Sequence, residues 1–151
     1  MIPKKADHSD ADTVARLLHE FNSEFGDFTP GPEALADRLR ELIPAGEVTV
    51  LLAGEPPRGL ALLRFRPSPW TETLDCYLEE LYVVPEHRGH GLGRALMEAA
   101  MALARERGAA HMDLGTSEDD TAARGLYESL GFTNREGKPD GPVMYFYERE
   151  L

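Results

Sequence analysis

The stretch that decides the fold is "LEELYVVPEHRGHGLGRALMEAA", residues 78–100. It begins as an apolar strand that carries two glutamates, and a proline ends that strand. Glycines then stand at positions 89, 91 and 93, and a run with the apolar spacing of a helix follows them. The first N–H groups of a helix form an anion site, and glycines let a bulky phosphate approach the backbone. The stretch therefore predicts a strand, a pyrophosphate-binding loop and a helix in direct succession.

Two other kinds of phosphate loop do not fit these residues. A Walker loop ends in Gly-Lys-Ser/Thr, and that ending occurs nowhere in the chain. A dinucleotide fingerprint counted from Gly91 has Leu96 where its last glycine is required. The pattern that does fit is Gln/Arg-x-x-Gly-x-Gly/Ala, which runs from Arg88 to Gly93. Arg88 and Arg94 can add positive charge at the edges of this loop.

The rest of the chain alternates helices and strands. Apolar spacing predicts helices over 9–25, 31–43, 92–107 and 120–130, and strands over 48–53, 60–67, 77–84, 110–116 and 141–150. This order predicts the α/β class with a mixed sheet. A length of 151 residues with 42% hydrophobic residues fits a single domain over residues 1–151.

Composition excludes several classes of protein. The formal charge of −11 argues against a nucleic-acid partner, because phosphate backbones bind basic surfaces. The chain shows no signal peptide and no run long enough for a membrane span, so a cytoplasmic protein without membrane attachment is expected. Cys76 is the only cysteine, and no His, Cys and carboxylate residues have metal-ligand spacing, so no metal is expected.

Two segments resemble the motifs of one family. "ELYVVPEHRGHGLGRALM" (80–97) resembles the central motif of the GNAT superfamily of acetyl-CoA-dependent N-acetyltransferases. "AARGLYESLGF" (122–132) resembles the second motif of that family, with matches at Ala123, Tyr127, Gly131 and Phe132. The resemblance covers about residues 8–149. It implies the GNAT fold, an α/β (α+β) fold with a mixed central sheet of about six to seven strands flanked by about four helices. It also implies acetyl-CoA as co-substrate.

The resemblance implies where the cofactor binds. In this family the strand before the loop lies beside the pantetheine arm, and the loop amides hold the pyrophosphate. Asp120 stands where the family often has an asparagine that contacts the cofactor, and it can instead cap its own helix. The implied cofactor-binding residues are Leu81, Tyr82, Val83, Arg88, Gly89, His90, Gly91, Leu92, Gly93, Arg94, Asp120 and Tyr127.

Transfer of an acetyl group to an amine needs a base, an oxyanion donor and an acid for the departing thiolate. The motif match implies Tyr127 as the acid, since a phenol stays protonated at neutral pH. Strand alternation sends Glu79 and Glu80 to opposite faces unless a bulge re-aims one of them. "YLEELYV" also resembles the matching strand of spermidine/spermine N-acetyltransferases, which favours Glu79 as the base, with Glu80 assisting. The family implies backbone N–H groups around Leu81 to Val83 as oxyanion donors.

The acceptor is the least defined part of the prediction. In this fold the first two helices and the loop between them wall the acceptor site, so Phe21, Glu24, Phe25 and Asp27, together with Glu79, are predicted to bind a cationic amine. Trp70 with Glu72, in the loop before the third long strand, and the aromatic last strand are the alternatives. A small-molecule amine or polyamine is favoured, and a peptide N-terminus, a lysine side chain or an aminoglycoside stays open. Direct transfer is preferred over an acyl-enzyme at Cys76, which has no histidine beside it. The alternative is a non-catalytic acyl-CoA-binding sensor on the same fold. Members of this family often form homodimers, so the resemblance also allows a homodimer.

Overall fold

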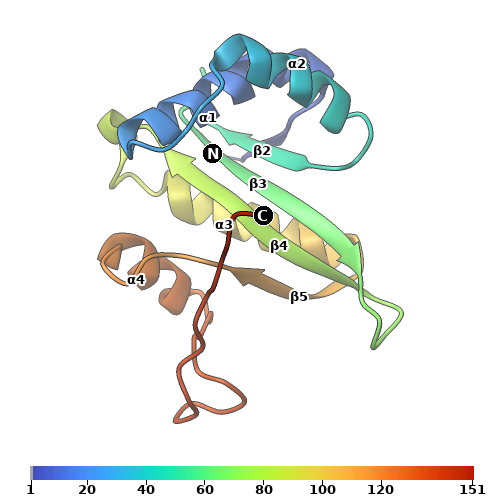
Figure 1. The fold of residues 1–151 in the computed structure, drawn as a ribbon, viewed down its shortest axis with the longest axis vertical. Helices are drawn as coiled ribbons and strands as arrows, with labels where there is room; N and C mark the ends of the chain where they lie inside the picture. Colours follow the sequence, from blue (N-terminus) through green and yellow to red (C-terminus); the bar gives the residue numbers. More distant parts are fainter. Residues whose placement is uncertain (1) are drawn as a thin grey trace. The chain divides into compact units, whose positions relative to one another are not determined.

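The computed structural model describes residues 2–151 and divides into two compact units, one ending at Leu114 and the other running over Gly115–Leu151. The first unit holds a five-stranded sheet with the helices α1, α2 and α3, and the second holds α4 and the C-terminal segment (Figure 1). The single domain predicted over residues 1–151 stays a prediction.

The strands are β1 Lys4–Lys5, β2 Thr49–Ala53, β3 Gly59–Pro67, β4 Leu74–Val83 and β5 Ala109–Leu114. The helices are α1 Ala11–Glu24, α2 Pro32–Leu42, α3 Leu92–Glu106 and α4 Thr121–Ser129. Short 3-10 turns cover His8–Asp10 (η1) and Pro85–His87 (η2). None of the helices within residues 2–151 is both long and apolar enough to cross a bilayer.

The helices begin where local chemistry favours them. A capping box formed by Asp7 and Asp10 precedes α1. The Asp7 carboxylate accepts the Ser9 N–H, and the Asp10 carboxylate accepts the Asp7 N–H. Pro32 is the first residue of α2, where its missing N–H costs no helical hydrogen bond. The helix α3 ends before Gly108, whose φ of +83° lies in the left-handed region.

The sheet is mixed, as the sequence predicts. The strands β1 to β4 pair antiparallel in chain order, and β5 joins β4 in parallel after the crossover through α3. The sheet has five strands rather than about six to seven. The strand predicted over residues 141–150 is wrong, because this segment forms only one isolated bridge, between Val143 and Arg135. Its aromatic residues have high strand propensity, but a strand also needs a partner to pair with.

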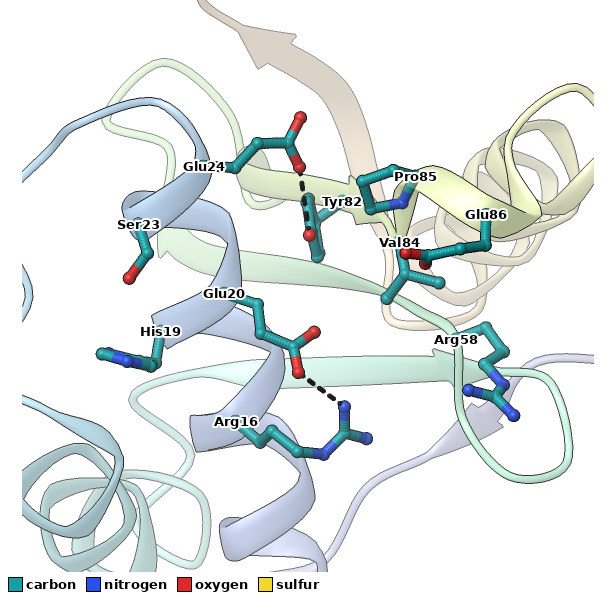
Figure 2. Close-up of a pocket in the computed structure, with 10 residues that line it drawn as sticks. All are labelled: Arg16, His19, Glu20, Ser23, Glu24, Arg58, Tyr82, Val84, Pro85 and Glu86. Atoms are coloured by element: carbon teal, nitrogen blue, oxygen red, sulfur yellow. Dashed lines mark hydrogen bonds and ion pairs between the residues drawn. The ribbon is translucent and has the colours of Figure 1, made fainter.

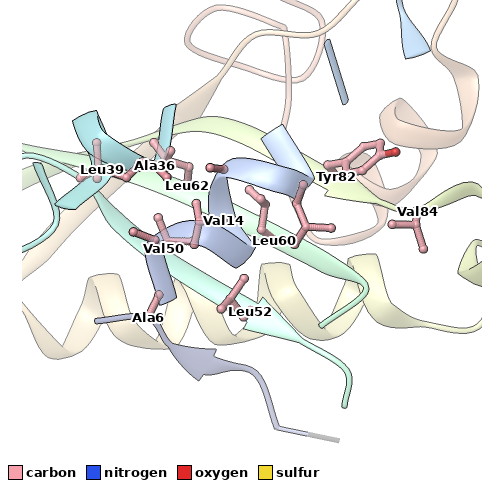
Figure 3. Close-up of a cluster of buried hydrophobic side chains, with 14 residues drawn as sticks. Ala6, Val14, Ala36, Leu39, Val50, Leu52, Leu60, Leu62, Tyr82 and Val84 are labelled. Atoms are coloured by element: carbon pink, nitrogen blue, oxygen red, sulfur yellow. The ribbon is translucent and has the colours of Figure 1, made fainter. Parts of the chain in front are cut away.

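The two faces of the sheet bury different side chains. One face packs against α1 and α2 around a cluster of fully buried residues that includes Val14, Leu39, Val50, Leu60 and Tyr82 (Figure 3). The other face packs against α3, where Leu96 and Met97 are fully buried. Every residue of β2 is buried, as expected for a strand covered on both faces. The sheet is therefore a rigid support for the ends of β4 and for the loop that follows it.

Candidate active site

A β-bulge on β4 re-aims the two glutamates. Leu62 of β3 pairs with Glu80 while its neighbour Leu63 pairs with Leu78, so Glu79 is the extra residue. An extra residue reverses the inside–outside alternation beyond it. Leu62 and Tyr82 both belong to the cluster packed against α1, so the bulge sends Glu80 to the α1 face of the sheet.

Glu80 has a carboxyl group with a raised pKa. Burial, and then the negative charges of Glu79 and Asp27, raise the pKa of its carboxyl to about 7. A carboxylate with this pKa is partly ionised near neutral pH and can accept a proton there. Asp27 lies three residues after the end of α1 and was predicted as part of the acceptor pocket, but its influence on Glu80 was not anticipated from the sequence.

Glu79 is in a different situation. Its carboxylate forms an ion pair with Arg64 of β3, and the side chains of both residues are partly exposed. Its carboxylate is thus already engaged by a cation of the protein, whereas Glu80 has the raised pKa. Of the two glutamates, Glu80 therefore has the chemistry of a base.

The strand β4 has an open edge beyond the bulge. Its pairing with β5 ends at Leu78 and Leu114, and within residues 2–151 no strand pairs with that edge of β4 from Glu79 onward. Val84 N–H donates to the Arg58 carbonyl on the β3 side, at 2.8 Å. Because backbone groups alternate along an antiparallel strand, those of Leu81 and Val83 face the open edge. A ligand lying along this edge meets backbone donors of the kind predicted for the oxyanion.

The loop after β4 has the conformation of an anion cradle. Gly89 and Gly91 have φ values of +80° and +86°, and a Cβ added at either would meet no protein atom within 4 Å. Gly91 is the N-cap of α3 and offers no side chain to the first helical N–H groups. The loop is thus open to a phosphate group, and its residues fit the pyrophosphate of a coenzyme.

The other predicted loop residues divide by exposure. His90 and Arg94 are exposed, and Gly93 is the second residue of α3. Leu92 begins α3 with its side chain buried, so it can serve a ligand only through its backbone N–H.

Arg88 is anchored on both sides of the loop. Its Nε donates to the Val83 carbonyl at 2.9 Å, and its Nη2 donates to Oε1 of Glu24 at 2.8 Å. The same Glu24 oxygen accepts the Tyr82 hydroxyl at 3.2 Å. The ion pair with Arg88 lowers the pKa of the Glu24 carboxyl, although partial burial opposes it. Glu24, predicted to bind a cationic acceptor, therefore already holds a cation of the protein.

The aromatic residues predicted for the acceptor wall pack next to Tyr82, whose hydroxyl donates to Glu24. Phe21 stacks on Tyr82 with ring centroids 4.8 Å apart and meets Phe25 edge-on at 5.5 Å. Phe21 packs against the core, whereas Phe25 is 57% exposed. Burial, followed by the hydrogen bond to Glu24, raises the pKa of Tyr82 to about 12. Of the two phenylalanines, Phe25 is the more exposed and offers the larger ring surface to a ligand.

A cavity of about 570 Å³ opens beside the anchored arginine. Figure 2 shows α1 contributing one wall and the ends of β3 and β4 the other. Its lining residues are Arg16, His19, Glu20, Ser23, Glu24, Arg58, Tyr82, Val84, Pro85 and Glu86. Arg16 and Glu20 are paired with each other at 3.1 Å. Of the predicted site residues only Glu24 and Tyr82 reach this cavity, and Glu80 is not among its walls.

The second unit carries the remaining predicted residues. The Asp120 carboxylate accepts the Ala123 N–H at 3.2 Å and is the N-cap of α4. Tyr127 is a buried residue of α4, and its ring lies edge-on to Phe132 at 6.1 Å. Burial, and then the charge of Asp120, raise the pKa of Tyr127 to about 12, so its hydroxyl stays protonated at neutral pH. Among residues 2–151 no three His, Cys, Asp or Glu side chains are grouped as metal ligands.

Comparisons with known proteins identify relatives of the chain. A family model described as the Acetyltransferase (GNAT) family matches residues 14–132. A thialysine N-epsilon-acetyltransferase of Caenorhabditis elegans is 28% identical over 126 residues, which are 82% of this chain and 78% of that protein. A mycothiol acetyltransferase of Thermobispora bispora is 52% identical over 65 residues, but the match covers 41% of this chain and only 22% of that protein.

Solved structures share the fold over the whole chain. A crystal structure of an Arthrobacter sp. FB24 protein assigned as an acetyltransferase superposes with a TM-score of 0.92 at 49% identity. That comparison covers 100% of this chain and 96% of the other. The fold class predicted from the sequence is therefore confirmed.

Proposed function

Because the chain belongs to the GNAT acetyltransferase family, whose donor is acetyl-CoA, we propose that it transfers the acetyl group directly to a primary amine of a small molecule. The observation that carries the proposal is the open edge of β4, which is followed after the short turn Pro85–His87 by the glycine loop at the start of α3. The chain is an acetyltransferase enzyme, which disfavours the non-catalytic sensor.

The donor is proposed to lie along β4. When bound, acetyl-CoA supplies the activated thioester, so the protein has only to position it and to move protons. The N–H groups at the start of α3 and at Gly89 and Gly91 hold the pyrophosphate, with the helix dipole behind them. The N–H groups of Leu81 and Val83 face the open edge, and one of them donates to the carbonyl oxygen of the acetyl group.

Glu80 is proposed as the base in preference to Glu79. An amine is protonated at neutral pH and cannot attack until it loses a proton. The Glu80 carboxyl, with its pKa raised to about 7, accepts that proton directly or through water. Glu79, which was favoured from the sequence, pairs with Arg64 and is proposed to keep the pKa of Glu80 high through its charge.

Tyr127 is proposed as the proton donor to the departing thiolate. This assignment rests on its position in the second motif and on the raised pKa, which keeps the phenol protonated. Cys76 is not proposed as an acyl carrier, because burial raises the pKa of its thiol to about 11 and the thiolate is the nucleophile. This supports direct transfer.

The acceptor is proposed to be a cationic amine that enters near Glu80. Asp27 and Glu80 supply negative charge there, and the exposed ring of Phe25 can stack on a cation. The thialysine enzyme, which this chain matches over most of its length, makes lysine-like side-chain amines the first class to test. Polyamines come second, because their chain of cations fits the same acidic surroundings.

The test is thiol release from acetyl-CoA in the presence of thialysine, lysine, spermidine, an N-terminal peptide and an aminoglycoside. Turnover with one amine class names the acceptor and supports the proposal. Tight binding of acetyl-CoA without turnover of any amine would instead favour the sensor. Tyr127→Phe measured in parallel shows whether turnover depends on the proposed acid.

A further inference from the structure

The first residue of the glycine-loop pattern makes a set of contacts that phosphate binding does not require. The Arg88 guanidinium donates to the Val83 carbonyl and to the Glu24 carboxylate, at 2.9 Å and 2.8 Å. Its Cζ also lies 5.7 Å from the centre of the Tyr82 ring. These three contacts belong to β4 and α1, so the arginine side chain is held against these two elements, although 43% of it stays exposed.

The backbone between β4 and the loop is folded into a closed corner. His87 N–H donates to the Val84 carbonyl at 3.0 Å, and Arg88 N–H donates to the Pro85 carbonyl at 3.3 Å. The contact of Nε with the Val83 carbonyl then joins the two ends of this corner. Gly89 and Gly91 follow at once, so the position of the glycine loop depends on where the corner is held.

Glu24 ties this corner to the last turn of α1. One of its oxygens accepts both Arg88 and the Tyr82 hydroxyl, and Tyr82 is stacked on Phe21 of the same helix. The exposed ring of Phe25 comes directly after Glu24 in the chain. A movement of this end of α1 therefore reaches the glycine loop through one ion pair.

We propose that Arg88 and Glu24 form a tether that positions the pyrophosphate loop and couples it to the acceptor-side end of α1. In this tether Arg88 is a positioning residue, and Glu24 is its anchor rather than a ligand of the acceptor amine. The proposal rests on the donor site proposed above. It predicts that loss of the tether weakens binding of acetyl-CoA and leaves the chemical step nearly unchanged, because no reacting group is moved.

The competing role for Arg88 is direct contact with the pyrophosphate. The two roles differ in a double-mutant cycle made of Glu24→Gln, Arg88→Gln and the double variant. If Arg88 acts through Glu24, each single variant should weaken acetyl-CoA binding by about five-fold, the lower end of typical coupling between sites, and the double variant should be no weaker than the worse single one. If Arg88 contacts the phosphate independently, Glu24→Gln alone should have little effect, or the two effects should multiply.

Glu20→Gln is the matched control, because Glu20 lies one turn earlier on α1, lines the same cavity and pairs with Arg16 instead. Its affinity for acetyl-CoA should equal that of the wild type. Affinity is measured by calorimetry, kcat and KM by thiol release, and folding by circular dichroism of each variant.

A non-additive cycle with kcat within about two-fold of the wild type would support the tether. Multiplying effects, or a Glu24→Gln variant that behaves like Glu20→Gln, would overturn it. Absence of acetyl-CoA binding by the wild type would overturn the donor site itself, and that outcome is distinct because it appears before any variant is made.

Discussion

Replacing Glu80 by glutamine should slow the enzyme and stabilise the protein at the same time. Both effects follow from the raised pKa of the Glu80 carboxyl, about 7 instead of 4.5. A shift of this size corresponds to at most about 3 kcal/mol against the ionised form in the folded protein. Because the side chain is partly open to water, we expect about 1 kcal/mol.

The sign of the stability effect depends on pH. Between pH 4.5 and about 7 the folded state holds the Glu80 proton more firmly than the unfolded state, so wild-type stability falls as pH rises through this window. Glutamine stays neutral and does not have this dependence. The variant should therefore match the wild type below pH 4.5 and exceed it by about 1 kcal/mol above pH 7.

The assay is urea unfolding at both ends of this window, together with kcat for the best amine. Loss of a general base should lower kcat by about 100-fold or more near neutral pH. Glu98→Gln is the control, because Glu98 is an exposed residue of α3 and its replacement should change neither quantity. A variant with wild-type kcat would remove Glu80 as the base. A variant that is destabilised above pH 7 would refute the argument from burial and repulsion.

Three further variants test other parts of the account. Tyr127→Phe should lower kcat by about ten-fold or more in steady-state kinetics, with little change in acetyl-CoA affinity. Normal turnover by this variant would disprove the acid role. Gly91→Val should abolish acetyl-CoA binding in calorimetry. Gly108→Val is the control, because Gly108 has a similar positive φ and equally open surroundings, and this variant should only lose stability. Equal losses of binding in both variants would point to backbone strain alone. Asp120→Ala should lower the free energy of unfolding in urea by about 1 kcal/mol, because the N-cap of α4 is removed. Asp120→Asn should keep the stability of the wild type, because asparagine can also cap a helix. Equal losses of stability in both variants would rule out capping.

Sequence alone was sufficient for the central part of the structure. The proline after the strand, the spaced glycines and the apolar periodicity of α3 are local signals, and each acts within a few residues. The order of helices and strands followed from the same signals, and it led to a mixed sheet. The capping role of Asp120 was also an alternative that local chemistry offered in advance.

The contacts that define the chemistry depend on residues far apart in the chain. Strand alternation predicts that a bulge would re-aim one of the two glutamates. The position of the bulge, however, depends on the pairing register of β3 and β4. The pairing of Glu24 with Arg88 joins residues 64 positions apart, and neither side chain reveals it. The segment 141–150 shows the opposite failure, since strong strand propensity predicted a strand where the described residues form only one isolated bridge.

The most direct test of the central claim is an amide NMR titration of the wild-type protein with acetyl-CoA. We expect saturable binding with the largest shifts at the amides that face the proposed donor, namely those of Leu81, Val83, Gly89, Gly91 and Leu92. Amides of β1 and β2, which lie at the far side of the sheet, should move little. Saturable binding whose shifts gather instead at Arg16, Glu20 and Arg58 would place the coenzyme in the cavity beside α1, and it would contradict the claim.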